Sequence, residues 1–211
     1  FDPVKDFKPV GLIGAVLNVL LVNPSFPARS LAELVSLAKA QPGHYQYASA
    51  GNGTLNHLLG EMLNSMAGIE LQHVPYRGVA PAINDVLGGQ LPIVFASMPS
   101  ALAHIKAGKL RALAVTSPRR VGVFGKVPTL EELGYKNSTF EDWYGFFAPA
   151  GTPPERVAYL NEAIVKTLRK PEVSKLVTDG GSEVVASTPE AFAAQLNSDT
   201  KRWSHVVKLS G

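Results

Sequence analysis

Between residues 44 and 116 the chain repeats one unit: a short apolar run, a corner marked by glycine or proline, and a segment with apolar residues at helical spacing. Together with an earlier apolar run, the expected strands are 10–22, 44–50, 70–74, 91–96 and 110–116. The expected helices are one opened by a Ser30–Glu33 capping box and stopped at Pro42, and then 54–67, 81–87 and 99–107. Single helices between successive strands are typical of βαβ crossovers. The pattern therefore predicts an α/β fold with a mostly parallel sheet, covered on both faces.

The pattern changes after residue 116. Residues 117–126 form a polar loop, and Thr129 and Glu132 have the spacing of a capping box for a short helix ending at Gly134. An aromatic strand follows over 140–149. The remainder is predicted to be helical, with helices opened by Pro153, by Pro171 and by Pro189, and with one short strand near 184–185.

Composition excludes several classes of function. The 211 residues contain no cysteine, which excludes disulfide scaffolds, zinc ribbons and thiol nucleophiles. The 20 basic and 17 acidic side chains leave a net charge of only +3, and the densest basic stretch, 106–120, lacks aromatic residues for stacking bases, so no nucleic-acid partner is expected. The five histidines form no i, i+4 pair, and therefore neither a metal site nor a cofactor is expected.

The corner Ser49-Ala50-Gly51-Asn52-Gly53-Thr54 joins a predicted strand to a predicted helix. Two glycines before a helix start offer backbone N–H groups and the positive end of the helix dipole, which together attract an anion. A P-loop would need Gly-Lys-Ser/Thr, and a dinucleotide site would need a third glycine where Asn56 stands. The sequence favours an anion site over a nucleotide site.

The same corner has an enzymatic alternative, a serine hydrolase with Ser49 as its nucleophile. A nucleophile elbow reads Gly-x-Ser-x-Gly, but Tyr47 stands at the first glycine, and His73, His104 and His205 are candidate bases only by default. In the simpler alternative Ser49 ends the strand and bonds a loop amide. His57 lies opposite the apolar stripe of its helix, as a surface residue would, yet one turn from the corner, and is a candidate ligand contact.

Two more strand ends carry small or polar residues, at 74–78 and at 96–100. Open α/β sheets bind ligands beyond the carboxyl ends of their strands. These two ends and the Ser49–Thr54 corner are therefore predicted to converge on one rim.

Long segments of the chain resemble one family. The segments "DPVKDFKPV", "YASAGNGTLNHLLGEMLNSMAG", "HVPYRGVAPAINDVLGGQLPIVF", "PSALAHIKAGKLRALAVTS", "VPTLEELGY" and "WYGFFAPAGTPPE", in that order, closely resemble the Bug-type solute receptors of tripartite tricarboxylate transporters. The resemblance implies a periplasmic, non-catalytic protein with a type II periplasmic-binding-protein fold. Such a protein has two lobes with mostly parallel sheets flanked by helices and joined by two crossing strands. It captures a small carboxylate between the lobes and delivers it to membrane subunits.

The resemblance also implies a ligand site. The loop of Ser49, Ala50, Gly51, Asn52, Gly53 and Thr54 would grip a carboxylate through the amides of Gly51 and Gly53 and the hydroxyls of Ser49 and Thr54. Tyr76, Arg77, Gly78 and Ser97 would form further walls, with His57 beside them. Di- and tricarboxylates, aromatic acids and acidic amino acids all suit such a site. Ala96-Ser97 offers no acidic or amide acceptor, which weakens the case for an ammonium-bearing solute.

The implied domains are 1–18 (a remnant of lobe one and the first crossing strand), 19–139 (lobe two) and 140–211 (the return strand and lobe-one helices). A full receptor carries a signal peptide and further lobe-one elements ahead of the point matching Phe1, so lobe one is expected to be incomplete here. The apolar stripe of Leu160, Ile164 and Leu168 then needs a cover, which self-association could supply. A receptor that reports its ligand to a membrane kinase is a further alternative.

Overall fold

The computed structural model describes residue 2, residues 5–120 and residues 125–209, without the side chains of 202–209. Part of the predicted polar loop (121–124) and the side chain of His205 lie outside this description. The chain divides into two compact units. The first combines residues up to Val16 with Trp143–Leu209, and the second is Leu17–Asp142. The domain boundaries expected from the family resemblance lie between residues 18 and 19 and between residues 139 and 140. They concern the lobes of a receptor of that family and stay a prediction.

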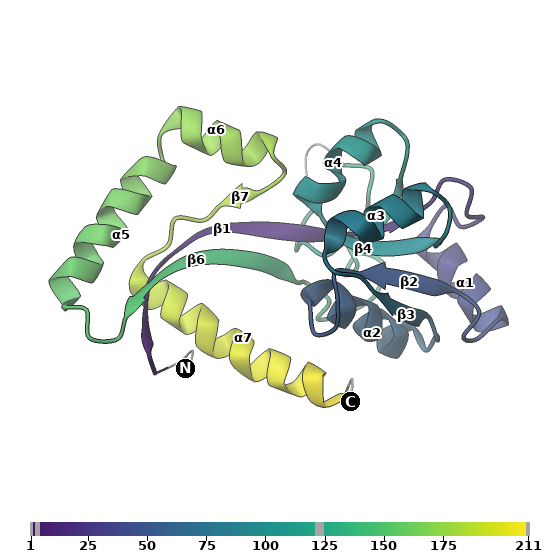
Figure 1. Cartoon of the computed structure of the whole chain (residues 1–211), viewed down its shortest axis with the longest axis horizontal. Helices are drawn as coiled ribbons and strands as arrows, with labels where there is room; N and C mark the ends of the chain where they lie inside the picture. Colours follow the sequence, from purple (N-terminus) through teal and green to yellow (C-terminus); the bar gives the residue numbers. More distant parts are fainter. Residues whose placement is uncertain (1, 3–4, 121–124, 210–211) are drawn as a thin grey trace. The chain divides into compact units, whose positions relative to one another are not determined.

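Two long strands, β1 (Phe7–Val22) and β6 (Glu141–Pro149), each contribute residues to both units (Figure 1). The second unit contains α1 (Leu31–Ala40), β2 (Gln46–Ser49), α2 (Leu55–Ala67), β3 (Gln72–Pro75), α3 (Val79–Leu87), β4 (Ile93–Ser97), α4 (Met98–Lys106) and β5 (Arg111–Val115). The first unit contains α5 (Pro154–Leu168), α6 (Pro171–Asp179), β7 (Glu183–Val184) and α7 (Pro189–Leu209). Among the described residues, no helix has the length and apolar character needed to cross a membrane.

The sheet of the second unit has the strand order β3-β2-β4-β1-β5. Strand β2 pairs in parallel with β3 and with β4, whereas β1 pairs antiparallel with both β4 and β5. The four shorter strands therefore run the same way and only β1 opposes them. The predicted α/β class with a mostly parallel sheet is confirmed.

Alternate residues of these strands face two helix layers. Val19 of β1 and Ala48 of β2 lie in the same apolar cluster as residues of α3 and α4, which Figure 1 shows on one side of the strands. On the side of α2, Tyr47 is fully buried against a glycine of the helix, since a Cβ at Gly60 would lie 2.2 Å from the Tyr47 ring. Burying one such large side chain stabilises a fold by roughly 1.5–3 kcal/mol. This close packing fixes the start of α2 relative to the end of β2.

The first unit has a smaller core. Phe192 of α7 is fully buried and packs edge-on to Trp143, and a Cβ at Gly145 would lie 2.3 Å from its ring. The helices α5 and α6 bury little, since α5 has one buried residue, Val157, and α6 has none. Of the predicted stripe on α5, Leu160 is 41% exposed, whereas Ile164 packs partly against the Val157 cluster.

The prediction of a short helix before Gly134 is wrong, because residues 130–134 form turns. The two capping hydrogen bonds are present: Glu132 N–H donates to Thr129 Oγ1 (3.1 Å), and Thr129 N–H donates to Glu132 Oε2 (2.9 Å). However, Gly134 adopts a positive φ of 93° and its amide bonds to the carbonyl of Glu131, three residues back. The Thr129–Glu132 capping box and the helix-terminating Gly134 are so close in sequence that too few residues remain between them for a helix to propagate.

Candidate functional site

One rim of the second unit gathers the carboxyl ends of its parallel strands. Strands β2, β3 and β4 end at Ser49, Pro75 and Ser97. Because β1 runs the opposite way and its Asn18 is in register with Ser97, β1 also brings Asn18 to this rim. The structure therefore brings the three predicted strand ends to one rim, the place where open α/β sheets bind ligands.

The loop from Ser49 to Thr54 is held by its own polar groups. The side chain of Ser49 is buried, and its Oγ accepts the amide of Gly51 (3.0 Å), as the simpler of the two serine hypotheses predicts. Thr54 Oγ1 donates to the carbonyl of Gly51 (2.7 Å). Gly51 has a φ of +131°, and a Cβ there would lie 3.0 Å from the carbonyl oxygen of Tyr76, so this turn requires glycine.

Two histidines stand directly behind this loop. The amide of Gly53 donates to Nδ1 of His57 (3.2 Å), and the His57 ring stacks on His73 with 4.0 Å between ring centroids. His73 Nε2 lies 2.6 Å from Ser49 Oγ. His57 is thus half-buried rather than a fully solvated surface residue, because His73 of β3 stacks on its ring. Burial lowers the pKa of His73, the nearby His57 lowers it further, and Glu61 opposes both.

Tyr47 supports the histidines from strand β2. Its hydroxyl lies 2.7 Å from Glu61 Oε1 and 3.1 Å from the carbonyl oxygen of His57, and its ring is tilted against His73. Burial raises the pKa of Tyr47 far above its usual range, and the Glu61 carboxylate adds to this effect. The phenol therefore remains a neutral hydrogen-bond donor at physiological pH.

A chain of buried polar side chains crosses the rim beside α2. Asn56 Nδ2 donates to Asn18 Oδ1 (2.9 Å), and Asn18 Nδ2 donates to Asp142 Oδ2 (3.2 Å). The Asn18 amide donates to Thr116 Oγ1 (3.0 Å). Burial raises the pKa of the Asp142 carboxyl, and the hydrogen bond from Asn18 partly offsets this. Sequence reasoning missed these residues, although an asparagine inside an otherwise apolar strand is a signal that could have found Asn18.

Three helices begin at this rim without help from a capping side chain. Their N-cap residues are Thr54 for α2, Gly78 for α3 and Ser97 for α4, and none makes a side-chain cap hydrogen bond. Instead, Ser97 Oγ lies 2.9 Å from Ser100 Oγ. The first amides of these helices are left for other acceptors, and the positive ends of three helix dipoles meet at the rim.

The remaining predicted residues lie in the loop after β3. The amide of Gly78 donates to the carbonyl of Ala50 (3.1 Å), which ties this loop to the Ser49–Thr54 loop. The Tyr76 hydroxyl donates to Asp85 of α3, and partial burial together with that carboxylate raises the pKa of Tyr76 to about 12. Arg77 and Asn52 are exposed. Such a surface of amides, hydroxyls and one cation can hold an anion.

The comparison with known families decides what kind of protein carries this site. Residues 1–211 match the model of the tripartite tricarboxylate transporter family receptor. The chain belongs to this family. Its closely related curated proteins include BugT of Bordetella pertussis, which is 35% identical over 211 residues, covering all of this chain and 65% of BugT. A protein encoded between tcbD and tcbE in a Pseudomonas species is 36% identical over 204 residues, covering 96% of this chain and 61% of that protein.

Solved structures agree with this family and with the periplasmic-binding-protein fold. The periplasmic binding protein BugD superimposes with a TM-score of 0.88 at 33% identity, covering 99% of this chain and 70% of BugD. A Rhodopseudomonas palustris protein solved with adipate gives a TM-score of 0.91 at 32% identity, covering 99% of this chain and 70% of that one. MatC of the same species, solved with malate, gives 0.87 at 30% identity, covering 98% and 71%.

The family and these neighbours are solute-binding receptors rather than enzymes, and this points to a non-enzyme. The present chain spans 61–65% of the length of BugT, the Pseudomonas protein and a relative from Agrobacterium vitis. The activity, solute and partners of the whole protein are therefore matters for proposal.

Proposed function

We propose that the chain acts in an extracytoplasmic solute-binding receptor, and that the rim of its second unit binds one carboxylate group of a small organic acid. The observation that carries this proposal is the meeting of three uncapped helix starts, α2, α3 and α4, around a glycine loop. Backbone amides at helix N-termini bind carboxylates well because the N–H groups point outward and the helix dipole favours negative charge.

Each predicted residue has a role in this proposal. The amides from Ala50 to Gly53 and the hydroxyls of Ser49 and Thr54 would surround the carboxylate. Tyr76, Arg77, Gly78 and Ser97 would contact the rest of the solute, and His57 would regulate access to the Gly53 amide. Asn18 and Asn56, which hydrogen-bond to each other at the start of α2, would hold that helix in place.

The solute class is best described as a dicarboxylate. Two relatives at 30–32% identity have been solved with dicarboxylates, one with adipate and the other with malate. Tricarboxylates, aromatic acids and acidic amino acids present the same carboxylate group and belong in the same screen. We expect the protein to work in the periplasm and to deliver its solute to the membrane subunits of a tripartite transporter.

The exposed apolar side chains of the first unit, Leu160 and Tyr159 among them, also support self-association of this chain when it is studied alone. Light scattering on the purified chain would show a mass that rises with concentration. A concentration-independent monomer would contradict self-association without affecting the binding proposal.

Binding is tested with two matched glycine variants. Gly53 and Gly108 both adopt a left-handed φ (+73° and +69°), and a Cβ at either would meet nothing within 4 Å. The substitutions Gly53→Ala and Gly108→Ala should therefore cost similar conformational strain, about 1 kcal/mol each. We expect titration calorimetry to show adipate or malate binding that Gly53→Ala weakens by about 10-fold, because alanine disfavours the left-handed φ that aims the Gly53 N–H, and a shift of the loop turns this retained N–H away from the carboxylate. Gly108→Ala should bind normally.

Two results would contradict the binding proposal. One is that none of the acids binds, and the other is that both glycine variants lose affinity equally. Adipamide, which has the shape of adipate without its charge, serves as the control ligand and should not bind.

A serine hydrolase is the second candidate function, because Ser49 Oγ and His73 Nε2 lie 2.6 Å apart. Against it, among the residues that the structure describes no carboxylate hydrogen-bonds to His73 to orient it. A fluorophosphonate probe should leave Ser49 unlabelled. Labelling that is lost in Ser49→Ala would favour the hydrolase.

A further inference from the structure

The two glycine amides at the centre of the proposed site already have acceptors within the protein. The amide of Gly51 donates to Ser49 Oγ (3.0 Å), and the amide of Gly53 donates to His57 Nδ1 (3.2 Å). A ring nitrogen that accepts a hydrogen bond carries no proton, so this contact requires a neutral His57 with its proton on Nε2. A solute carboxylate that uses the Gly53 amide must first displace the imidazole.

Both acceptors are connected through His73. Its ring is stacked on His57 at 4.0 Å, and its Nε2 lies 2.6 Å from Ser49 Oγ. The other titratable groups that face this pair are Tyr47 of β2, whose ring is tilted against His73, and Glu61 of α2, which lies 2.7 Å from the Tyr47 hydroxyl. The Tyr47 phenol stays neutral, so Glu61 is the charge among these groups that can balance a proton on the histidines.

We propose that His57 and His73 form a proton-operated latch on the Ser49–Thr54 loop. Neutral His57 accepts the Gly53 amide in the free protein, and the histidine pair takes up a proton when a solute carboxylate displaces the His57 imidazole. This inference rests on the proposed carboxylate site and adds its regulation. A protonated imidazole cannot accept from the Gly53 amide, because both groups are then donors. A carboxylate oxygen can accept from both, and hydrogen bonds between charged partners are the stronger ones.

The stacking limits the latch to one extra proton. Two imidazolium rings with centroids 4.0 Å apart would repel each other, so protonation of one ring opposes protonation of the other. Carboxylate binding should therefore take up at most one proton. At full coupling the affinity rises by about 10-fold for each pH unit of acidification within the range where the pair titrates.

The first experiment needs no solute. Nuclear magnetic resonance follows the Gly53 amide and the histidine rings of the free chain from about pH 8 to about pH 5.5. We expect the Gly53 amide signal to shift with the midpoint of the His57 ring. In His57→Gln the side-chain oxygen is an acceptor that does not titrate, and the Gly53 signal should become independent of pH. The control His44→Gln removes an exposed histidine before β2 and should leave the Gly53 titration unchanged.

The second experiment uses adipate and malate as probes. Calorimetry in two buffers of different ionisation enthalpy measures proton uptake on binding, and we expect uptake approaching one proton in the natural sequence and none in His57→Gln. His73→Gln removes the ring stacked on His57 and the partner of Ser49 Oγ, so it should weaken the coupling between acid binding and proton uptake.

The possible outcomes separate the latch from the proposed function. If the Gly53 amide signal does not shift together with the His57 ring signals as the pH changes, the latch is overturned. Adipate binding without proton uptake also overturns the latch but leaves the carboxylate site standing. If Gly53 follows His57 while no carboxylate binds, the latch on the free loop is supported and the proposed function fails.

Discussion

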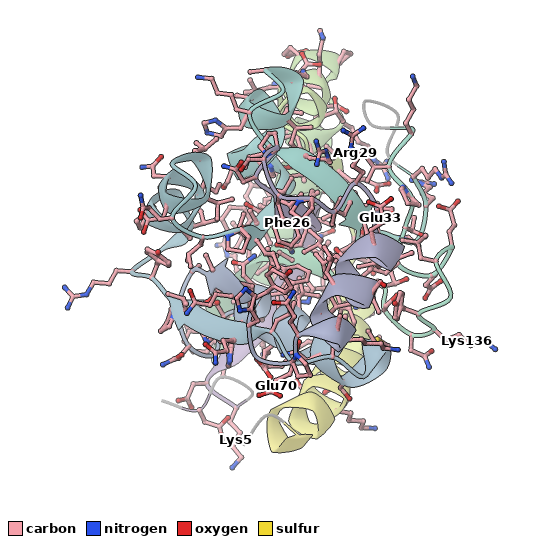
Figure 2. All side chains as sticks on the ribbon, turned by 90° about the vertical axis from the view of Figure 1, so that its right-hand side faces the viewer. Lys5, Phe26, Arg29, Glu33, Glu70 and Lys136 are labelled. Atoms are coloured by element: carbon pink, nitrogen blue, oxygen red, sulfur yellow. The ribbon has the colours of Figure 1, made fainter. Side chains whose placement is uncertain are left out.

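The two rims of the sheet in the second unit differ in whether side chains cap the helices that begin there. At one rim α1 begins with a side-chain cap: Ser30 Oγ accepts the amide of Glu33 (3.2 Å), and Glu33 Oε2 accepts the amide of Arg29, the residue before the N-cap (2.6 Å). Figure 2 looks onto this rim and labels Arg29 and Glu33 at the start of α1. At the other rim α2, α3 and α4 begin without any side-chain cap.

This difference shows that helix capping, which stabilises the fold, and anion binding, which needs free helix amides, compete for the same N–H groups. A capping side chain stabilises a helix because it satisfies amides that would otherwise be left without partners. A receptor that binds an anion through those amides must forgo this stabilisation, since a cap would occupy the donors. Under the proposed function, the uncapped rim is the ligand side of the sheet, and the capped rim is the side at which no ligand is expected.

The largest effect is expected at Gly51. Its φ of +131° lies outside the left-handed helical well, and a Cβ would lie 3.0 Å from the Tyr76 carbonyl oxygen, so Gly51→Ala should lower the free energy of unfolding by about 2–3 kcal/mol. It should also abolish measurable adipate binding. Chemical denaturation and calorimetry give the two values.

Gly43, at the capped rim, is the matched control for Gly51. It has a φ of +69°, and its nearest neighbour would be the flexible end of Glu70 at 3.4 Å, so Gly43→Ala should cost only about 1 kcal/mol and leave binding intact. Equal losses of binding in the two variants would show that the rims do not differ in function.

A slightly smaller effect is expected at Asn18, which is fully buried at the uncapped rim. Asn18→Leu removes the acceptor of Asn56 and the donor to Asp142, and should lower the free energy of unfolding by about 2 kcal/mol because buried polar groups lose their partners. Carboxylate affinity should fall as well, since α2 loses an anchor near its first turn.

The control for Asn18 is Asn23, just beyond the other end of β1, where its side chain donates to the carbonyl of Val86 (2.6 Å). Asn23 Oδ1 also accepts from the amide and the hydroxyl of Ser25, so Asn23→Ala removes three hydrogen bonds and should cost about 1–2 kcal/mol, without changing affinity. Unchanged adipate affinity in Asn18→Leu would mean that the polar chain beside α2 is purely structural.

The sequence predicts the loops and helix starts of the rim well, but it predicts poorly which side chains contact one another there. Glycine-bounded apolar runs locate β2 and the start of α2, because local backbone preferences decide these features. The partners of Asn18 and His73 depend on which strands are neighbours. No local pattern indicates that β1 lies antiparallel between β4 and β5, or that β3 places His73 beside Ser49. Similarly, the capping box before Gly134 is read correctly from sequence, but the helix it suggests is absent because the stop follows at once.

A comparison of two serine caps isolates the capping difference itself. Ser30→Ala should lower the free energy of unfolding by about 1 kcal/mol, because Ser30 caps α1. Ser97→Ala should lower it by less than about 0.5 kcal/mol, because Ser97 caps nothing and loses only its partner Ser100. Urea unfolding of both variants measures the difference. A cost at Ser97 equal to that at Ser30 would mean that α4 is capped in solution and that its amides are not free for a ligand.

The smallest effect is the pH dependence that His73, at the uncapped rim, gives to the free energy of unfolding. Its pKa is lowered in the folded protein, chiefly by burial, whereas in the unfolded chain it should have the ordinary value of about 6.5. Between the lowered value and about 6.5 the unfolded state binds more protons. The contribution of His73 is therefore complete above about pH 6.5 and is lost as the pH falls through the lowered pKa.

The free energy of unfolding should accordingly decrease on acidification, and His73→Gln should reduce that slope, whereas His44→Gln at the capped rim should preserve it. Urea unfolding at about pH 7.5, 6.5 and 5.5 measures the slopes. An unchanged slope in His73→Gln would show that His73 titrates alike in the folded and unfolded chains. In that case the stacking of His57 on His73 would neither disfavour protonation of His73 nor couple that protonation to the loop. The two rims would then differ only in whether side chains cap their helices.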